Sequence, residues 1–204
     1  MGGILLLAAA LWALDAQTAS AQMRGFIQAG ITGSTFRGGA LEDASPIYRL
    51  AGGGGIRYQY PNGFEIETGL NYLVKGGEVT GSFEGIALVG VSEITYVSVP
   101  ILAGYRFAPV GRFQPRVVAG PSMSFKTDAR ITYRAVGGDI EQTNVDEGIQ
   151  DRDLAWVFGL DLNTRVGGES LFAGLRVILG NSNARTRDPE VLHTTFGLFT
   201  GIQF

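Results

Sequence analysis

The sequence has 204 residues, which is the length of a single domain, and 45% of them are apolar. With a formal net charge of −3, this composition excludes a disordered acidic chain and a basic protein that coats nucleic acid, so we expect no nucleic-acid partner. Cysteine is absent, which excludes a disulfide scaffold, a thiolate metal site and a cysteine nucleophile.

The first 21 residues have the pattern of a secretory signal peptide. The apolar run Ile4–Leu14 precedes the small-x-small sequence of Ala19 and Ala21, so we expect cleavage before Gln22. An uncleaved membrane anchor is disfavoured, because about eleven apolar residues cannot span a hydrocarbon core that needs about twenty. The sequence therefore predicts an exported protein with one domain at residues 22–204.

Alternation of apolar and polar residues recurs along the mature chain, and helical periodicity does not. The alternating stretches predict eight strands, at residues 24–34, 49–60, 64–75, 94–107, 113–126, 153–165, 171–182 and 192–204. Short turns follow the second, fourth and sixth strands, whereas longer polar links follow the others, at residues 35–48, 76–93, 127–152 and 183–191. This order predicts an all-β fold, an eight-stranded antiparallel up-and-down transmembrane β-barrel with short turns at one end.

Two residue types are unusual in the predicted strands. Pro100, Pro115 and Pro121 cannot donate a hydrogen bond to a neighbouring strand, so we expect local bulges, or a strand start in the case of Pro115. Glycines such as Gly159 and Gly174 alternate on the charged face. We expect them to relieve crowding, because an eight-stranded barrel has room only for side chains.

The two faces of the predicted strands differ in charge. One face is uncharged, as at Leu160, Leu162 and Leu175, and the other carries seven charged residues, namely Arg57, Glu65, Glu67, Arg106, Arg116, Asp161 and Arg176. An arginine that faces lipid near the midplane costs about 2–4 kcal/mol, so we expect the charged face to line the lumen. A soluble barrel of the lipocalin type would reverse this arrangement and place the apolar face inside.

The final segment, HTTFGLFTGIQF, predicts the strand that closes the barrel against the first strand. Closure is required because an unpaired strand edge in lipid leaves backbone groups without hydrogen bonds. We expect Phe196, Leu198 and Ile202 to face lipid and Phe204 to lie at the membrane interface. A terminal phenylalanine after alternating apolar residues resembles the C-terminal signal that the barrel-assembly machinery recognises in outer-membrane proteins.

Segments along the mature chain together resemble the PorT-like outer-membrane β-barrel family, which is common in Bacteroidota. The matching stretches are GFIQAGITGSTF, RLAGGGGIRYQYPNGFEIETGLNYLVKGGE, ITYVSVPILAGYRF, RVVAGPSMSF, FGLDLNTR, LFAGLRVILGNSN and FGLFTGIQF. The resemblance implies a Gram-negative outer-membrane protein surrounded by lipid and lipopolysaccharide, with extracellular loops and with short turns and both mature termini in the periplasm. The namesake of the family is implicated in secretion of proteases, but most relatives have no assigned role.

The mixed charges of the lumen leave two interpretations. A salt-bridged plug is favoured, because charges in a narrow lumen must pair or lose solvation without compensation. The alternative is a gated path for ions or a small solute. We therefore expect a non-enzymatic protein without a cofactor, structural or accessory to transport or secretion, with a channel as the first rival.

Two other segments carry residues with potential chemistry. His193 suggests a base for a lipid-active enzyme with partners from the long-loop end, but a place on the polar rim is favoured; the candidate partners are Asp43, Ser45, Ser182, Asp188 and Glu190. The acidic segment 139–153 offers oxygen ligands to Ca²⁺. A solvated loop is the favoured interpretation of this segment, because its spacing does not match an EF-hand.

Overall fold

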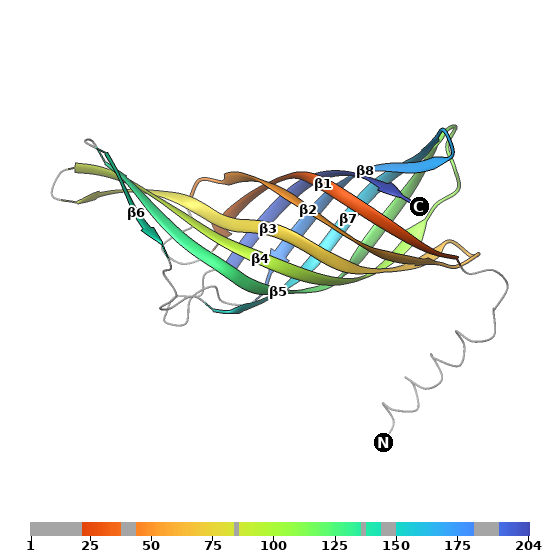
Figure 1. The fold of residues 1–204 in the computed structure, drawn as a ribbon, viewed down its shortest axis with the longest axis horizontal. Helices are drawn as coiled ribbons and strands as arrows, with labels where there is room; N and C mark the ends of the chain where they lie inside the picture. Colours follow the sequence, from red (N-terminus) through yellow and green to blue (C-terminus); the bar gives the residue numbers. More distant parts are fainter. Residues whose placement is uncertain (1–21, 38–43, 84–85, 136–137, 144–149, 182–191) are drawn as a thin grey trace, which may run out of the picture.

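Eight strands of the computed structural model close into an antiparallel barrel, and a ninth, shorter strand pairs outside it (Figure 1). The structure describes residues 22–37, 44–83, 86–135, 138–143, 150–181 and 192–204, so the predicted signal peptide and its Ala19 and Ala21 lie outside the described residues. The strands are β1 (Gln22–Arg37), β2 (Ile47–Gln59), β3 (Phe64–Phe83), β4 (Ile86–Arg106), β5 (Phe113–Ala135), β6 (Gly138–Thr143), β7 (Arg152–Val166), β8 (Glu169–Gly180) and β9 (Leu192–Gln203).

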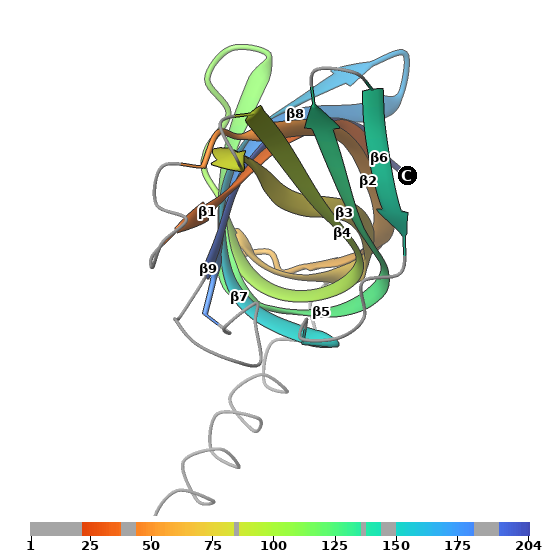
Figure 2. The same cartoon turned by 90° about the vertical axis from the view of Figure 1, so that its left-hand side faces the viewer.

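The last strand closes the barrel against the first, as the C-terminal pattern predicts. β9 pairs with β1 from Phe26↔Gln203 to Arg37↔Leu192, and β4 pairs with β5 to complete the ring. Figure 2 looks along the barrel and shows this closed ring of strands. The fold class is therefore confirmed: each barrel strand pairs with a neighbour on both sides, which leaves no open edge in the barrel wall.

Two of the predicted long links are largely strand. β3 and β4 pair as far as Phe83↔Ile86, and β5 continues to Ala135 and pairs with β6. The pairing of β2 with β3 ends at Tyr72, so these extensions lie beyond the barrel, to the left in Figure 1. We call the part beyond the Ser45↔Glu78 bridge the projecting sheet, which comprises residues 79–83, 86–90, 130–135 and 138–143. The sequence pattern assigned these segments to polar links and missed their strand pairing.

The prolines interrupt the strand ladders without shifting them. Between β4 and β5 the ladder runs to Pro100↔Ser122 and resumes at Ala103↔Ala119 in the same register. The register shift between these strands lies instead at Thr95 and Tyr96. The expectation of bulges at Pro100 and Pro121 is therefore wrong, because the loss of a few ladder bonds accommodates the prolines without an inserted residue.

The apolar face of the wall points outward and the charged face inward. Leu160, Leu162 and Leu175 are 48%, 48% and 57% exposed, whereas the arginines and carboxylates of the opposite face are mostly buried. Aromatic rings gather outside near the short turns, where the ring of Tyr105 lies 5.4 Å from that of Phe64. An apolar outer band with interfacial aromatics is the surface that a bilayer requires of a barrel. Among the described residues, no helix has the length and apolar content to cross a membrane.

Candidate functional site

Arg116 is the centre of a charge cluster that fills part of the barrel lumen. It lies on β5 and is 1% exposed. Its Nε donates to Glu65 Oε2, its Nη2 to Glu67 Oε2 and its Nη1 to Asp161 Oδ2, and each donor–acceptor distance is 2.5 Å. Because Glu65 and Glu67 lie on β3 and Asp161 lies on β7, one guanidinium links three strands across the lumen.

Three further arginines extend this cluster. Arg57 Nε donates to Glu67 Oε2 over 2.7 Å, and Arg176 donates to both carboxylate oxygens of Asp161. Arg106 Nε lies 3.4 Å from Glu65 Oε1 at the more exposed edge. The structure thus brings together all of the charged residues that the alternation assigns to the lumen. We call them the lumen ion network, which consists of Arg57, Glu65, Glu67, Arg106, Arg116, Asp161 and Arg176.

Glycines in the wall make space for this network. A Cβ atom on Gly159 would lie 2.6 Å from Arg176 Nη1, and one on Gly174 would overlap Asp161 Oδ1. Both glycines pair across strands with the network itself, as Gly159↔Arg176 and Asp161↔Gly174. The inward glycines therefore allow the Arg176–Asp161 pair to lie flat against the wall of β7 and β8.

Two inward phenylalanines pack against adjacent sides of the Arg57 guanidinium. The Arg57 Cζ lies 4.5 Å from the ring centroid of Phe26 and 4.4 Å from that of Phe172, in the geometry of cation–π contacts. Both rings are almost fully buried. Sequence reasoning missed these contacts, although Phe172 shares its strand face with Arg176, four residues further along.

An apolar layer and a second ion pair fill the lumen towards the projecting sheet. Lys75 Nζ lies 2.6 Å from Asp153 Oδ2, and both residues are buried. Between this pair and the lumen ion network lies a cluster of buried apolar side chains, which includes Leu73, Leu102, Val118, Val157, Ile178 and Phe199. The void beside this layer is about 30 Å³. Charged and apolar layers together therefore fill the lumen from the Lys75–Asp153 pair to the lumen ion network.

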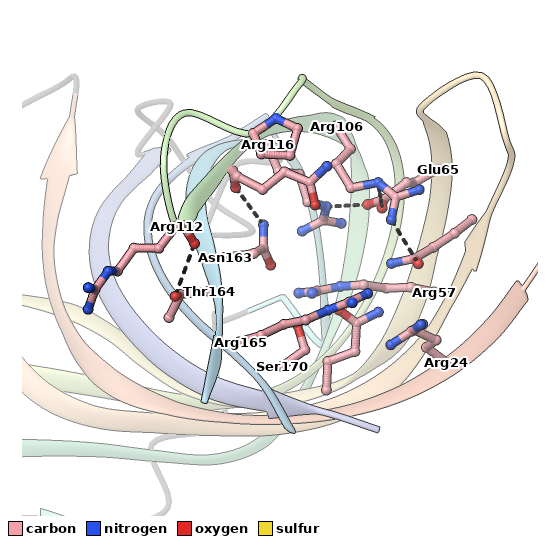
Figure 3. Close-up of a pocket in the computed structure, with 14 residues that line it drawn as sticks. Arg24, Arg57, Glu65, Arg106, Arg112, Arg116, Asn163, Thr164, Arg165 and Ser170 are labelled. Carbon is pink, nitrogen blue, oxygen red and sulfur yellow. Dashed lines mark hydrogen bonds and ion pairs between the residues drawn. The ribbon is translucent and has the colours of Figure 1, made fainter. Parts of the chain in front are cut away.

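A larger cavity lies at the short-turn end of the barrel. It has a volume of about 470 Å³, and Figure 3 shows the residues that line it. Arg57, Glu65 and Arg116 of the lumen ion network contribute to its wall, together with Arg24 from β1 and Arg165 from β7. The charged lining is therefore mainly cationic.

The sequence of residues 16–183 matches the family described as outer membrane protein beta-barrel domain. The chain belongs to this family. The solved structure of Neisserial surface protein A (NspA) is similar in fold, with 12% sequence identity and a TM-score of 0.53 over 91% of this chain and 99% of that one. The N-terminal β-barrel domain of Pseudomonas aeruginosa OprF is 17% identical, with a TM-score of 0.41 over 91% and 100%. Among curated proteins, none matches this sequence.

His193 occupies a different place in this outer-membrane barrel from the predicted polar rim. It is 1% exposed, and its ring lies 5.1 Å from that of Phe36 and 6.5 Å from that of Tyr96. Neither ring nitrogen has a hydrogen-bond partner among the described residues. Of the proposed catalytic partners, Ser45 is exposed and bridges to Glu78. The others lie outside the described residues, namely Asp43, Ser182, Asp188 and Glu190.

The described carboxylates of the acidic segment do not gather at one place, and its Asp146 and Glu147 lie outside the described residues. Asp139 and Glu141 lie on β6, Asp153 pairs with Lys75 inside the barrel, and Asp151 lies 3.0 Å from Lys126 Nζ. The interpretation of this whole segment as a solvated loop is wrong, because β6 and the start of β7 are strand. Within the described part of the chain, no group of three or more His, Asp or Glu residues is arranged to hold a metal ion.

The C-terminal residues follow the predicted faces. Phe196, Leu198 and Phe204 are 58%, 60% and 66% exposed on the outer surface, and Ile202 is half-buried. Phe204 exchanges two backbone hydrogen bonds with Gly25, each of 3.0 Å, so the terminal residue is part of the closing seam. Recognition of this segment by the barrel-assembly machinery stays a prediction.

Proposed function

We propose that this outer-membrane barrel is non-enzymatic, does not conduct, and serves as an accessory to transport or secretion through its projecting sheet. The observation that carries the proposal is the filled lumen. Arg116 contacts three carboxylates there, and the apolar layer lies next to them on the side towards the projecting sheet. Separating the two members of a buried ion pair leaves an uncompensated charge in the lumen, which raises the free energy of the protein. A gated path would have to separate several such pairs at once, and the plug is therefore favoured over the channel.

The backbone edges of the projecting sheet support a docking role. One edge of β3 faces away from β4, and its pairing with β2 ends at Tyr72. Beyond Tyr72, the backbone pairing described at this edge is the bridge between Glu78 and Ser45. At the opposite edge, β6 pairs with β5. Exposed strand edges are templates on which an extended segment of another protein can add a strand. We propose that an unidentified secretion or transport partner binds there.

The proposed orientation follows from the two ends of the barrel. Short turns and the C-terminal strand end lie together, opposite the projecting sheet (Figure 1). In outer-membrane barrels the short turns are periplasmic and the longer connections extracellular. We propose that the projecting sheet lies outside the cell among lipopolysaccharide, and that both mature termini are periplasmic. The resemblance to PorT-like barrels fits this arrangement and a role beside a secretion system.

Conductance in planar lipid bilayers tests the closed lumen. We expect the purified, folded protein to show no discrete conductance steps, because the ion network and the apolar layer both block the path. A variant that changes both Leu102 and Val118 to Ser serves as a comparison, since it removes part of the apolar layer without altering a charge. Reproducible conductance steps from the wild-type protein would contradict the proposal.

Site-specific photo-crosslinking in the native membrane tests the docking role. Thr80 is exposed on β3 in the projecting sheet, and Leu160 is exposed on the lipid-facing wall. A crosslinker at position 80 is expected to capture one discrete protein partner, and a crosslinker at position 160 is expected to capture none. Equal patterns of adducts at the two positions would argue against a partner on the sheet.

A further inference from the structure

The cavity at the short-turn end is built from several strands that each contribute an arginine. Arg24 comes from β1, Arg57 from β2, Arg106 from β4, Arg116 from β5 and Arg165 from β7. In Figure 3, Arg24, Arg57 and Arg165 extend towards the middle of the hollow, whereas Arg112 turns away from it. The cavity therefore concentrates guanidinium groups that the fold brings together from distant parts of the sequence.

These positive charges are not balanced within the cavity. Glu65 is the carboxylate among the lining residues. It already pairs with Arg116 at a distance of 2.5 Å and with Arg106 at a distance of 3.4 Å. Among the described residues, no carboxylate pairs with Arg24 or Arg165; the contact of Arg24 is a 3.0 Å hydrogen bond to Gln22 Oε1. Clustered charge of one sign in a low-dielectric cleft raises the local concentration of opposite ions.

Buried hydrogen-bond donors in the same lining lack acceptors. Arg57 is 0% exposed, and its Nη1 and Nη2 have no hydrogen-bond partner among the described residues. Gln203 is 4% exposed, and its Nε2 also has none. The ring centroids of Phe26 and Phe172 lie 6.3 Å apart, so the two rings pack against adjacent sides of the Arg57 guanidinium and supply no acceptor oxygen to its Nη atoms. Buried donors of this kind are normally satisfied, so an acceptor from outside the chain fits here.

The chemistry of the lining defines the class of ligand. Planar guanidinium groups bind the oxygens of phosphate and carboxylate groups through paired hydrogen bonds. The volume of about 470 Å³ lies within the range of small-molecule sites, which is about 300–1,000 Å³. Three or more arginines with unused donors favour an anion with at least two negative charges over a monocarboxylate.

We propose that the short-turn cavity binds a small phosphate-bearing anion between Arg24, Arg57 and Arg165. The phosphate can belong to a free phosphate ester or to the head group of a phospholipid at the same membrane surface. The proposal does not depend on the docking role of the projecting sheet, which lies at the other end of the barrel. Binding there would complete the hydrogen bonds of Arg57 and neutralise the cationic mouth.

Titration calorimetry with pyrophosphate as the probe tests this site. The mature protein is placed in nanodiscs of a zwitterionic phosphatidylcholine, and we expect saturable binding that weakens as the salt concentration rises. The variant Arg24→Gln/Arg165→Gln is expected to lose at least tenfold in affinity. Neither residue belongs to the lumen ion network, so this variant is expected to fold, as checked by heat-modifiable gel mobility.

Matched controls separate site binding from general charge attraction. Arg112→Gln also removes one positive charge near the cavity, but this side chain points away, so pyrophosphate affinity is expected to stay within twofold of the wild type. Absence of saturable binding, or equal losses in Arg112→Gln and the double variant, would overturn the proposal. Nanodiscs with phosphatidylglycerol identify the source: competition with pyrophosphate indicates a lipid head group, and unchanged affinity indicates a free phosphate ester.

Discussion

Arg116 and Asp161 are directly opposite each other on β5 and β7, and Arg116 Nη1 lies 2.5 Å from Asp161 Oδ2. Both side chains are withdrawn from solvent, at 1% and 0% exposure. The same guanidinium also contacts two carboxylates of β3, so the pair couples distant sectors of the barrel wall. The lumen ion network therefore acts as an internal brace as well as a plug.

Changing Arg116 to Met should strongly destabilise the folded barrel. The substitution leaves Glu65, Glu67 and Asp161 short of a partner in the lumen, and removing one member of a buried pair costs about 3–5 kcal/mol. Urea unfolding in lipid vesicles, followed by tryptophan fluorescence, measures the change in the free energy of unfolding. Arg49→Met is the control, because the exposed Arg49–Glu93 pair is worth about 0–1 kcal/mol. Similar losses in the two variants would count against the brace.

Gly174→Ala should destabilise the barrel through the same network. The added methyl group would overlap Asp161 Oδ1 and displace the carboxylate that Arg116 and Arg176 share. Overpacking of this kind costs about 1–3 kcal/mol, which the same unfolding assay can resolve. Gly81→Ala is the matched control, since a Cβ atom there meets nothing within 4 Å. If both substitutions have equal effects, crowding around Asp161 is not the cause.

Deletion of Phe204 should reduce assembly of the barrel in the outer membrane. The deletion removes two backbone hydrogen bonds to Gly25 in the closing seam and an exposed ring at the interface. The measurement is the fraction of heat-modifiable, folded protein in the membrane after expression. Phe107→Ala removes an exposed ring at the same end without touching the seam, and should assemble normally. A fully assembled deletion variant would exclude Phe204 as an assembly signal.

The sequence predicted which residues face the lumen but not which of them pair. Alternation fixes the face of Arg57 and Glu67 because a strand has a period of two residues. The partners depend on register and strand tilt, so the pairing of Lys75 with Asp153, on strands that are not neighbours in the sheet, has no local signal. His193 was placed on the rim because its distance from the barrel end depends on the same tilt.

The projecting sheet escaped prediction for a different reason. Sequence patterns reveal a strand when one of its faces is buried against lipid or a core. Residues 73–95 instead pair as a hairpin up to Phe83↔Ile86, although apolar and polar residues do not alternate strictly along it, as in the run Ile86–Val89. The interpretation of this hairpin as a polar link is therefore wrong, and its strand pairing is seen only in the three-dimensional arrangement.

Paired arginine substitutions should locate the boundary between the membrane wall and the projecting sheet. Leu175 lies on the outer face between Leu160 and Leu198 of the adjacent strands, so Leu175→Arg places a charge in the lipid-facing band and should cost about 2–4 kcal/mol. Thr80→Arg alters an exposed position of the projecting sheet, where we propose that water surrounds the strand, and should change stability by less than about 0.5 kcal/mol. Urea unfolding in vesicles measures both values. A large loss at position 80 would place that part of the sheet in the membrane, and a neutral result at position 175 would contradict the assignment of the outer face to lipid.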